Sequence, residues 1–228
     1  MAEPYYTPKT LKFLTELALN NHREWFESHK ANYEALVREP SLRLIRDAEP
    51  ALERFSPHFV AVAKKVGGSL MRVQRDTRFV KDAEPYKTNI GIQFRHSVGK
   101  DVHAPGLYIH VAPDECFIGA GVWHPDAPLL QQIRQQIVER PQVWQKAVRD
   151  KRFTELFELS GDTLKRAPKG FDPEHPAIAD LMRKDHIAVA ALSKRELSSP
   201  NLVELLFDRF QRSRAFMRFL CEAGGLPF

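Results

Sequence analysis

The chain has little cysteine and no long hydrophobic run. Cys116 and Cys221 are far apart and belong to no C-x-x-C pair, and two cysteines in 228 residues make no disulfide framework, which favours a reducing compartment. The N-terminus lacks a basic region followed by an apolar run, so no secretory signal is visible. No stretch approaches the roughly 18 apolar residues of a membrane helix. We therefore expect a cytoplasmic protein without a membrane partner.

Compact catalytic motifs are also missing. There is no Walker loop, no G-x-G-x-x-G after a strand, no G-x-S-x-G and no H-E-x-x-H. Low-complexity tracts and repeats of fixed period are absent, which argues against solenoids and disordered tails. An enzyme whose residues come from scattered positions is not excluded. The sequence thus leaves catalysis open and indicates no particular cofactor.

The composition is typical of a soluble globular protein, with 43% apolar and 28% charged residues. A chain of 228 residues suffices for one sizeable core, and no change in composition marks a boundary, so we predict a single domain over 1–228. The net charge of +5 mildly favours anionic partners, but the chain lacks the dense basic tracts of nucleic-acid-binding arms.

Helical periodicity occupies both ends of the chain. Thr7-Pro8 predicts a helix start and Asn20-Asn21 its end, since hydroxyls and proline favour the first turn and asparagine tolerates the last. A second helix is expected to end at Pro40, and a third to run to about Phe55. After residue 123 the helical period returns, and Ser199-Pro200 predicts the start of a long final helix.

Between the helices the hydrophobic period changes from 3.6 to 2. Alternation predicts strands at about 69–75, 89–96, 106–111 and 116–123, with 186–192 as a candidate fifth strand. We therefore predict the α+β class, an antiparallel sheet covered by N-terminal and C-terminal helices. The turn at 112–115 predicts a hairpin with Val111 opposite Cys116 and His110 opposite Phe117. One hairpin face is then aliphatic, and the other carries aromatic side chains, His110 and two glycines.

The segment 70–89 is the part of the chain least typical of a scaffold. It combines basic residues with acidic and aromatic ones: Arg72, Arg75, Arg78, Lys81 and Lys87 with Asp76, Asp82, Glu84, Phe79 and Tyr86. Such a charged stretch between two strands predicts a structured loop against the sheet, where binding groups concentrate. Converging guanidinium groups match phosphate or carboxylate, although the acids fit an ordinary surface ion-pair network equally well. By alternation, Arg72, Gln74, Gln93 and Arg95 share the polar face with Tyr108 and His110.

Other candidate sites are weaker. His103, His110, Cys116 and His124 are close in sequence, but the hairpin register puts Cys116 and His110 on opposite faces, so no metal site is predicted. Aromatic residues between basic ones can stack on the bases of a single strand. Most of them are expected to pack as core instead, with Tyr86 and Tyr108 as the exceptions. The basic residues Lys165, Arg166 and Lys169 fit an exposed loop or part of an anion site.

Three motifs together resemble a known family. They are Asn20-Asn21-His-Arg-Glu-Trp25-Phe26 followed by Lys30 and Tyr33; Arg72 to Asp82 with Pro85-Tyr86-Lys87-Thr88; and Leu164 to Gly170. They resemble the conserved hypothetical proteins of bacteria and fungi labelled domain of unknown function 2461. The resemblance spans nearly the whole chain and implies a single-domain bacterial cytoplasmic protein without an established activity. Ala83-Glu84 departs from the pattern, where the family commonly has lysine and a small or hydroxyl residue, so one positive charge is lost.

Our leading hypothesis is a protein, enzyme or not, that binds an anionic small molecule bearing phosphate or carboxylate. The expected ligand-binding residues are Arg72, Arg75, Asp76, Arg78, Lys81, Asp82, Tyr86, Lys87, Tyr108 and His110. The alternatives are a single-stranded nucleic-acid binding module on the same surface and a protein–protein interaction module without catalysis. A strand that contacts several phosphates would lose affinity steeply with salt, which separates the first alternative from a compact pocket.

Overall fold

The computed structural model describes residues 3–76, 84–98 and 104–228. Within these ranges the protein has the predicted α+β class, built on an open antiparallel sheet in the order β1-β2-β3-β4-β6-β5. The strands are β1 (Phe59–Val60), β2 (Ile90–His96), β3 (Gly106–Val111), β4 (Cys116–Val122), β5 (Glu158–Ser160) and β6 (His186–Ala191).

Helices precede and follow the central strands. The N-terminal helices are α1 (Pro8–Leu19), α2 (Arg23–Ser28), α3 (Lys30–Tyr33), the π-helical turn η1 (Glu34–Arg38) and α4 (Glu39–Phe55). The later helices are α5 (Ala127–Glu139), α6 (Pro141–Arg149), α7 (Lys151–Thr154), α8 (Ile178–Leu181), α9 (Lys194–Leu197), α10 (Leu202–Arg212) and α11 (Arg214–Ala223). Among the described residues, no helix combines the length and the apolar character needed to cross a membrane.

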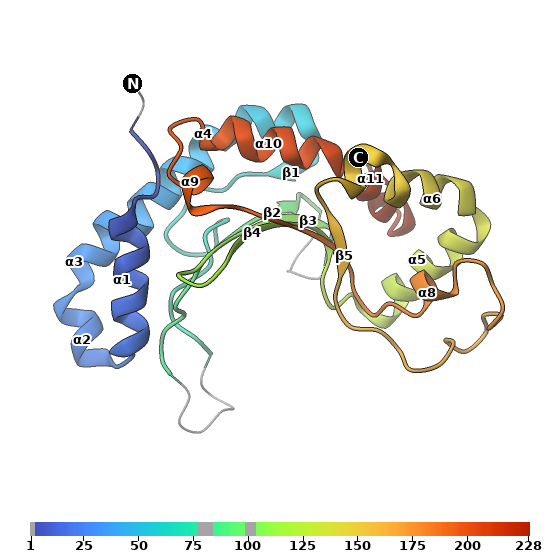
Figure 1. Ribbon diagram of the computed structural model, residues 1–228, viewed down its shortest axis with the longest axis horizontal. Coiled ribbons are helices and arrows are strands. Elements are labelled where there is room, and N and C mark those ends of the chain that lie inside the picture. Colours follow the sequence, from blue (N-terminus) through green and yellow to red (C-terminus); the bar gives the residue numbers. More distant parts are fainter. Residues whose placement is uncertain (1–2, 77–83, 99–103) are drawn as a thin grey trace.

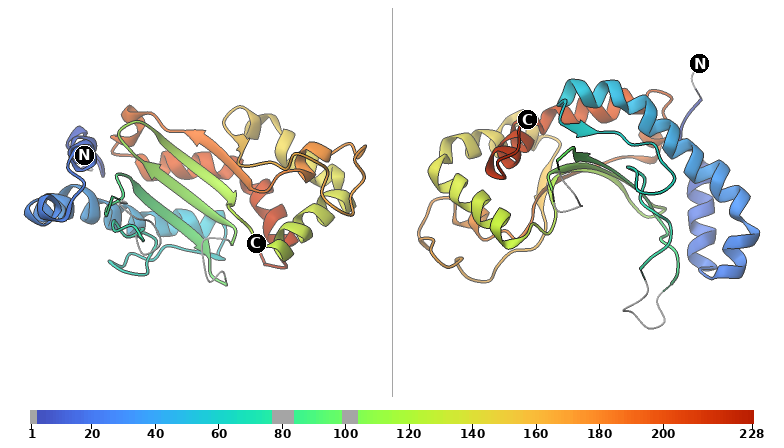
Figure 2. Two further views of the ribbon diagram at one scale, coloured as in Figure 1. Left: turned by 90° about the horizontal axis from the view of Figure 1, so that it is seen from below. Right: turned by 180° about the vertical axis from the view of Figure 1, so that it is seen from behind.

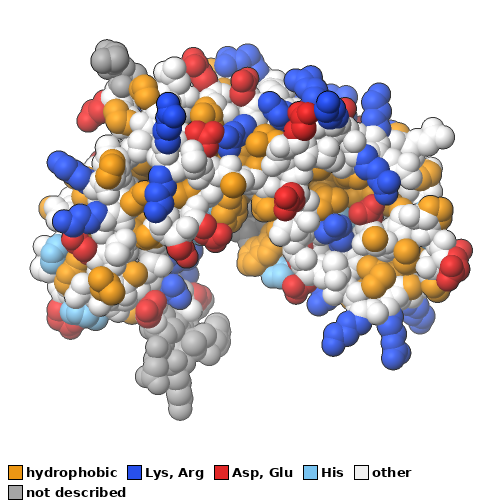
Figure 3. Space-filling model, viewed as in Figure 1, with side chains coloured by type: hydrophobic (Ala, Val, Ile, Leu, Met, Phe, Trp, Pro, Cys, Tyr) orange, Lys and Arg blue, Asp and Glu red, His pale blue; other side chains and the backbone are white. Residues whose placement is uncertain are grey.

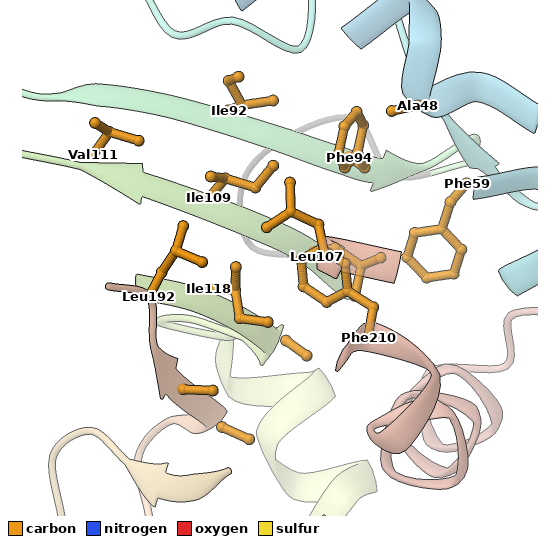
Figure 4. Close-up of a cluster of buried hydrophobic side chains, with 14 of the residues drawn as sticks. Ala48, Phe59, Ile92, Phe94, Leu107, Ile109, Val111, Ile118, Leu192 and Phe210 are labelled. Carbon is orange, nitrogen blue, oxygen red and sulfur yellow. The ribbon is translucent and has the colours of Figure 1, made fainter. Parts of the chain in front are cut away.

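The predicted hairpin is confirmed. Val111 pairs with Cys116 and His110 with Phe117, so alternate side chains of β3 and β4 share a face. The aliphatic side chains of this hairpin are buried. They form the core together with residues from the covering helices, such as Ala48 of α4 and Phe210 of α10 (Figure 4).

The two faces of the sheet differ in their cover. Figure 1 shows the sheet as an arch with α4 and α10 over its convex side, α1 to α3 at one end and α5 to α8 at the other. Seen from below, the strands have no helix over them (Figure 2). The space-filling surface is hollowed between the two ends (Figure 3). We call this uncovered side the concave face; Tyr108, His110 and Phe117 lie on it, half-buried.

The strand predictions are correct for β2, β3, β4 and β6, and need correction at the edges of the sheet. Residues 69–75 are not a regular strand. This segment makes single bridges, Leu70 with Ile92 of β2 and Gln74 with Tyr86. The short strands β1 and β5 were not predicted, because two or three residues are too few to show alternation.

The helix predictions also need two corrections. Pro40 does not end a helix but occupies the first turn of α4, directly after the π-helical turn η1. Because a π-helical turn is wider than an α-helical turn, it relieves the clash between the proline ring and the backbone carbonyl one turn earlier. The long final helix starts at Leu202 and is interrupted at Ser213, which separates α10 from α11.

Candidate functional site

A small pocket lies at the β2 side of the concave face, and we call it the rim pocket. Its volume is about 200 Å³, and it is lined by the loop from Lys65 to Arg72 together with Gln93 and Arg95 of β2. Three of these side chains, Lys65, Arg72 and Arg95, are cationic, and none of the described residues that line the pocket is acidic. The expectation that Arg72, Gln93 and Arg95 share one surface is therefore confirmed, whereas Gln74 is exposed and does not line the pocket.

The loop that closes the rim pocket is held by backbone contacts. The hydroxyl of Ser69 accepts a hydrogen bond from the Val62 N–H at 3.0 Å, and the Ser69 N–H donates to the Val62 carbonyl at 2.8 Å. Gly68 lies so close to this carbonyl that a Cβ there would be 2.4 Å from the oxygen. The Met71 N–H then donates to the Gly91 carbonyl of β2. A tight turn followed by pairing with β2 thus fixes the backbone on either side of the pocket.

Two arginines near the rim pocket have acidic partners among the described residues. Arg72 faces Asp76 at 3.7 Å and Arg75 faces Glu84 at 3.7 Å, with all four side chains at least one-third exposed. Exposed ion pairs of this kind contribute little to stability. Burial lowers the pKa of Lys87, and the charges of Arg72 and Arg75 lower it further. Lys87 is therefore close enough to both guanidinium groups to feel their repulsion, which an anion between them would relieve.

Arg75 and Tyr86 contact each other on either side of the undescribed residues 77–83. The Arg75 Nε–H donates to the Tyr86 carbonyl at 3.0 Å. The side-chain amide of Asn21 donates to the same carbonyl and accepts from the Tyr86 N–H, each at 3.0 Å. The Tyr86 ring stacks on Phe26 with centroids 4.1 Å apart and is buried. The prediction that Tyr86 lies outside the core is therefore wrong, because its ring is buried against Phe26 of α2.

Tyr108 and His110 extend the polar surface from the rim pocket onto the concave face. Tyr108 pairs across the ladder with Gln93, which lines the pocket. Its hydroxyl lies 3.3 Å from Nδ1 of His110, and the amide nitrogen of Asn89 lies 3.5 Å from the same atom. Burial lowers the pKa of His110 and raises that of Tyr108. Both groups are therefore neutral near pH 7 and act as hydrogen-bonding groups rather than charges.

Most of the chain matches one family of proteins. A family model described as conserved hypothetical protein (DUF2461) matches residues 9–219. The chain belongs to this family. No curated protein and no solved structure matches it.

Two of the segments that carry the DUF2461 resemblance meet in the structure. Asn21 and Phe26 of the N-terminal motif hold the backbone and the ring of Tyr86 in the central motif. The third motif begins at Leu164, whose N–H donates to the Met182 carbonyl, in the loop between β5 and α8. Because β5 and β2 lie near opposite edges of the sheet, this loop does not join the rim pocket (Figure 1).

The structure therefore divides the predicted site residues into groups. Arg72, Arg75, Asp76 and Lys87 lie together at the rim, and Tyr108 and His110 lie on the adjoining concave face. Arg78, Lys81 and Asp82 are outside the described residues. Sequence reasoning missed Lys65, which lines the pocket. The available signal was the neighbouring pair Gly67-Gly68, because glycines favour tight turns. In the structure Gly67 has a φ of +70°.

Within the described parts of the chain, no group of three or more His, Cys, Asp or Glu side chains is arranged to hold a metal ion. Cys116 and Cys221 are both buried and unpaired. Burial raises the pKa of the Cys221 thiol to about 12 and also raises that of Cys116. Such thiols are poor nucleophiles, because the thiolate is the reactive form.

Proposed function

We propose that this protein binds a small anionic ligand bearing phosphate or carboxylate at the rim pocket. The observation that carries the proposal is the lining, to which Lys65, Arg72 and Arg95 all contribute and in which none of the described residues is acidic. Guanidinium groups match both oxygens of such an anion. The pocket, at about 200 Å³, is smaller than typical drug-sized sites, so it fits the charged group of a ligand.

The neighbouring residues support the same reading. Lys87 lies within electrostatic reach of Arg72 and Arg75, so an anion bound at Arg72 gains from the whole cluster. Asp76 and Glu84 orient the two arginines. Gln93 lines the pocket, and Tyr108 and His110 beside it offer hydrogen bonds to the rest of the ligand. Arg78, Lys81 and Asp82 remain part of the proposed site on sequence alone.

Titration calorimetry with inorganic phosphate, pyrophosphate, citrate and a short oligothymidylate tests the proposal. We expect at least one small anion to bind, and Arg72→Ala to weaken it about tenfold or more, because a charge-assisted bidentate contact is lost. The Arg72 side chain is 64% exposed, so the variant should keep its thermal midpoint. Arg195→Ala removes an exposed arginine of α9 and serves as the matched control.

The outcomes separate the alternatives. The proposal would be contradicted if Arg72→Ala and Arg195→Ala bound the anion equally well, or if no probe bound to the wild type. Either result would favour the protein–protein interaction module instead. Preference for the oligothymidylate, with a steep loss of affinity between 50 and 200 mM salt, would instead identify a single-stranded nucleic-acid surface. A compact pocket responds to salt more weakly, because it contacts fewer phosphates.

A further inference from the structure

A second basic surface lies on the helical side of the molecule, away from the rim pocket. A groove of about 560 Å³ is bounded by α6, α7 and the junction of α10 with α11, and we call it the helical groove. Six of the thirteen described residues that line it are basic, whereas Lys and Arg make up 34 of the 228 residues of the chain. They are Arg140, Lys146, Arg152, Arg212, Arg214 and Arg218. Figure 3 shows basic side chains gathered along the upper edge of the molecule, over α4, α10 and α11.

The two acidic side chains in the lining are already engaged. Glu222 pairs with Arg140 at 2.7 Å. The Asp150 carboxylate accepts the Arg152 backbone N–H at 2.9 Å, as the cap of α7. Among the described residues, no carboxylate is within ion-pair distance of Lys146, Arg152 or Arg212. The groove therefore keeps an excess of positive charge.

Favourable interactions with helix dipoles explain the positions of only some of these basic residues. Lys146 and Arg212 lie in the last turns of α6 and α10, where cations are favourable. Arg214 is the first residue of α11, where the helix dipole disfavours a cation. Its position is fixed by other contacts, a hydrogen bond from Nε to the Phe55 carbonyl at 2.9 Å and the Phe228 ring 5.3 Å from its guanidinium carbon. Arg218 stacks on the same ring from the next turn. Two arginines are thus held in place at the groove by contacts other than an ion pair with a described acidic residue.

The groove also has apolar lining. Val143, Ala147, Ala215 and Phe219 lie between the basic residues, and Val143 is 41% exposed. The volume falls in the range of sites that enclose a small molecule. Because the cations come from several helices, they surround the groove rather than form a single stripe, which suits a compact ligand with several negative charges better than an extended strand.

We propose that the helical groove binds an organic oligophosphate, a small molecule in which two or more linked phosphate groups are attached to an apolar or aromatic body. Arg152, Arg212 and Lys146 contact the phosphates, since none of the described carboxylates competes for these cations. Arg214 and Arg218, fixed by Phe228, hold one wall of the groove. The apolar lining contacts the body of the ligand. This site is independent of the rim pocket.

Calorimetric titration of ATP and of tripolyphosphate at 150 mM salt tests the assignment. We expect both to bind, and the double variant Arg152→Ala/Arg212→Ala to weaken each about tenfold or more, because two charge-assisted contacts are lost. ATP should bind more tightly than tripolyphosphate, since only ATP covers the apolar lining. A matched control, Lys169→Ala/Arg195→Ala, removes two exposed charges outside both sites and should bind as the wild type does.

Two further comparisons make the test decisive. Arg72→Ala, which disables the rim pocket, should still bind ATP through the helical groove; complete loss of ATP binding in that variant would place the ligand in the rim pocket and overturn the proposal. Equal weakening in the two double variants would show a response to net charge alone, and absence of binding by the wild-type protein would also overturn it. Tighter binding of a short oligonucleotide than of ATP would exclude the small-molecule assignment.

Discussion

His186 is a buried polar side chain for which the described residues provide no hydrogen-bond partner at either ring nitrogen. It lies in β6 with its ring 5.9 Å from that of Trp144. Burial lowers the pKa of His186 from 6.5 to about 3, and the charges of Arg183 and Arg134 act in the same direction. The imidazole is therefore neutral in the folded protein at ordinary pH, and its burial without hydrogen bonds is unfavourable.

We predict that His186→Leu removes a pH-dependent loss of stability. The unfolded chain takes up a proton at His186 as the pH falls below about 6.5, whereas the folded protein does not do so until about pH 3. The wild type should therefore lose about 1.4 kcal/mol of unfolding free energy per pH unit through this residue over that window, and none above it. Urea unfolding from pH 7.5 to 4.5 measures the difference between variant and wild type. A difference that does not change with pH would contradict the prediction.

At the scale of elements, the approach of β4 to β6 depends on Gly121. Its φ is +134°, and a Cβ at this position would lie 2.1 Å from the His186 carbonyl oxygen. Gly119, two residues earlier, has ordinary space, since its nearest neighbours would be the Tyr108 Cβ at 3.7 Å and the Ala188 carbonyl oxygen at 3.9 Å. The same strand thus offers a required glycine and a replaceable one.

We predict that Gly121→Ala destabilises the protein by about 3 kcal/mol or more, because backbone strain and a clash with main-chain atoms add together. Gly119→Ala should change stability by less than about 1 kcal/mol, since glycine inside a strand is itself unfavourable. Urea midpoints of the two variants provide the measurement. Insolubility of Gly121→Ala alone would agree with the prediction, and similar midpoints for both variants would refute it.

The elements that sequence alone predicts are those with local signals. The hairpin of β3 and β4 is specified by alternation and a four-residue turn, so the pairing of His110 with Phe117 was accessible. Residues 69–75 were harder to predict, because they do not pair with one strand throughout. The Ser69 carbonyl accepts a hydrogen bond from the Gln93 N–H of β2, whereas Gln74 forms a bridge with Tyr86. Sequence reasoning placed Arg72 and Arg95 on one surface, and both line the rim pocket. It missed the helical groove, whose residues come from helices distant in the sequence and meet only through packing.

At the scale of the whole molecule, one hydrophobic core connects the N-terminal helices, the sheet and the C-terminal helices. Aromatic contacts make the connection: Phe94 of β2 lies 6.1 Å from Phe207 of α10, and Trp144 of α6 lies 5.0 Å from Phe219 of α11. Since α11 follows α10 after Ser213 alone, these two helices link the part of the chain from α5 to α8 to the sheet. The pairing of β5 with β6 links it to the sheet directly. The single domain over 1–228, which was expected from the uniform composition of the chain, stays a prediction that this continuity makes testable.

We predict that the chain unfolds as one cooperative unit, which substitution of Trp144 can test far from its own position. Trp144 is fully buried, and its indole N–H donates to Asp180 at 2.8 Å, so Trp144→Ala should cost about 3 to 5 kcal/mol. Hydrogen exchange in low urea should then show that amides of α4 and β3 lose as much protection as those of α6, because all exchange through global unfolding. Leu19→Ala, at a position 79% exposed, is the control and should leave protection nearly unchanged. Loss of protection confined to α5 through α8 would instead mean that these helices unfold on their own, and that the helical groove spans two units of different stability.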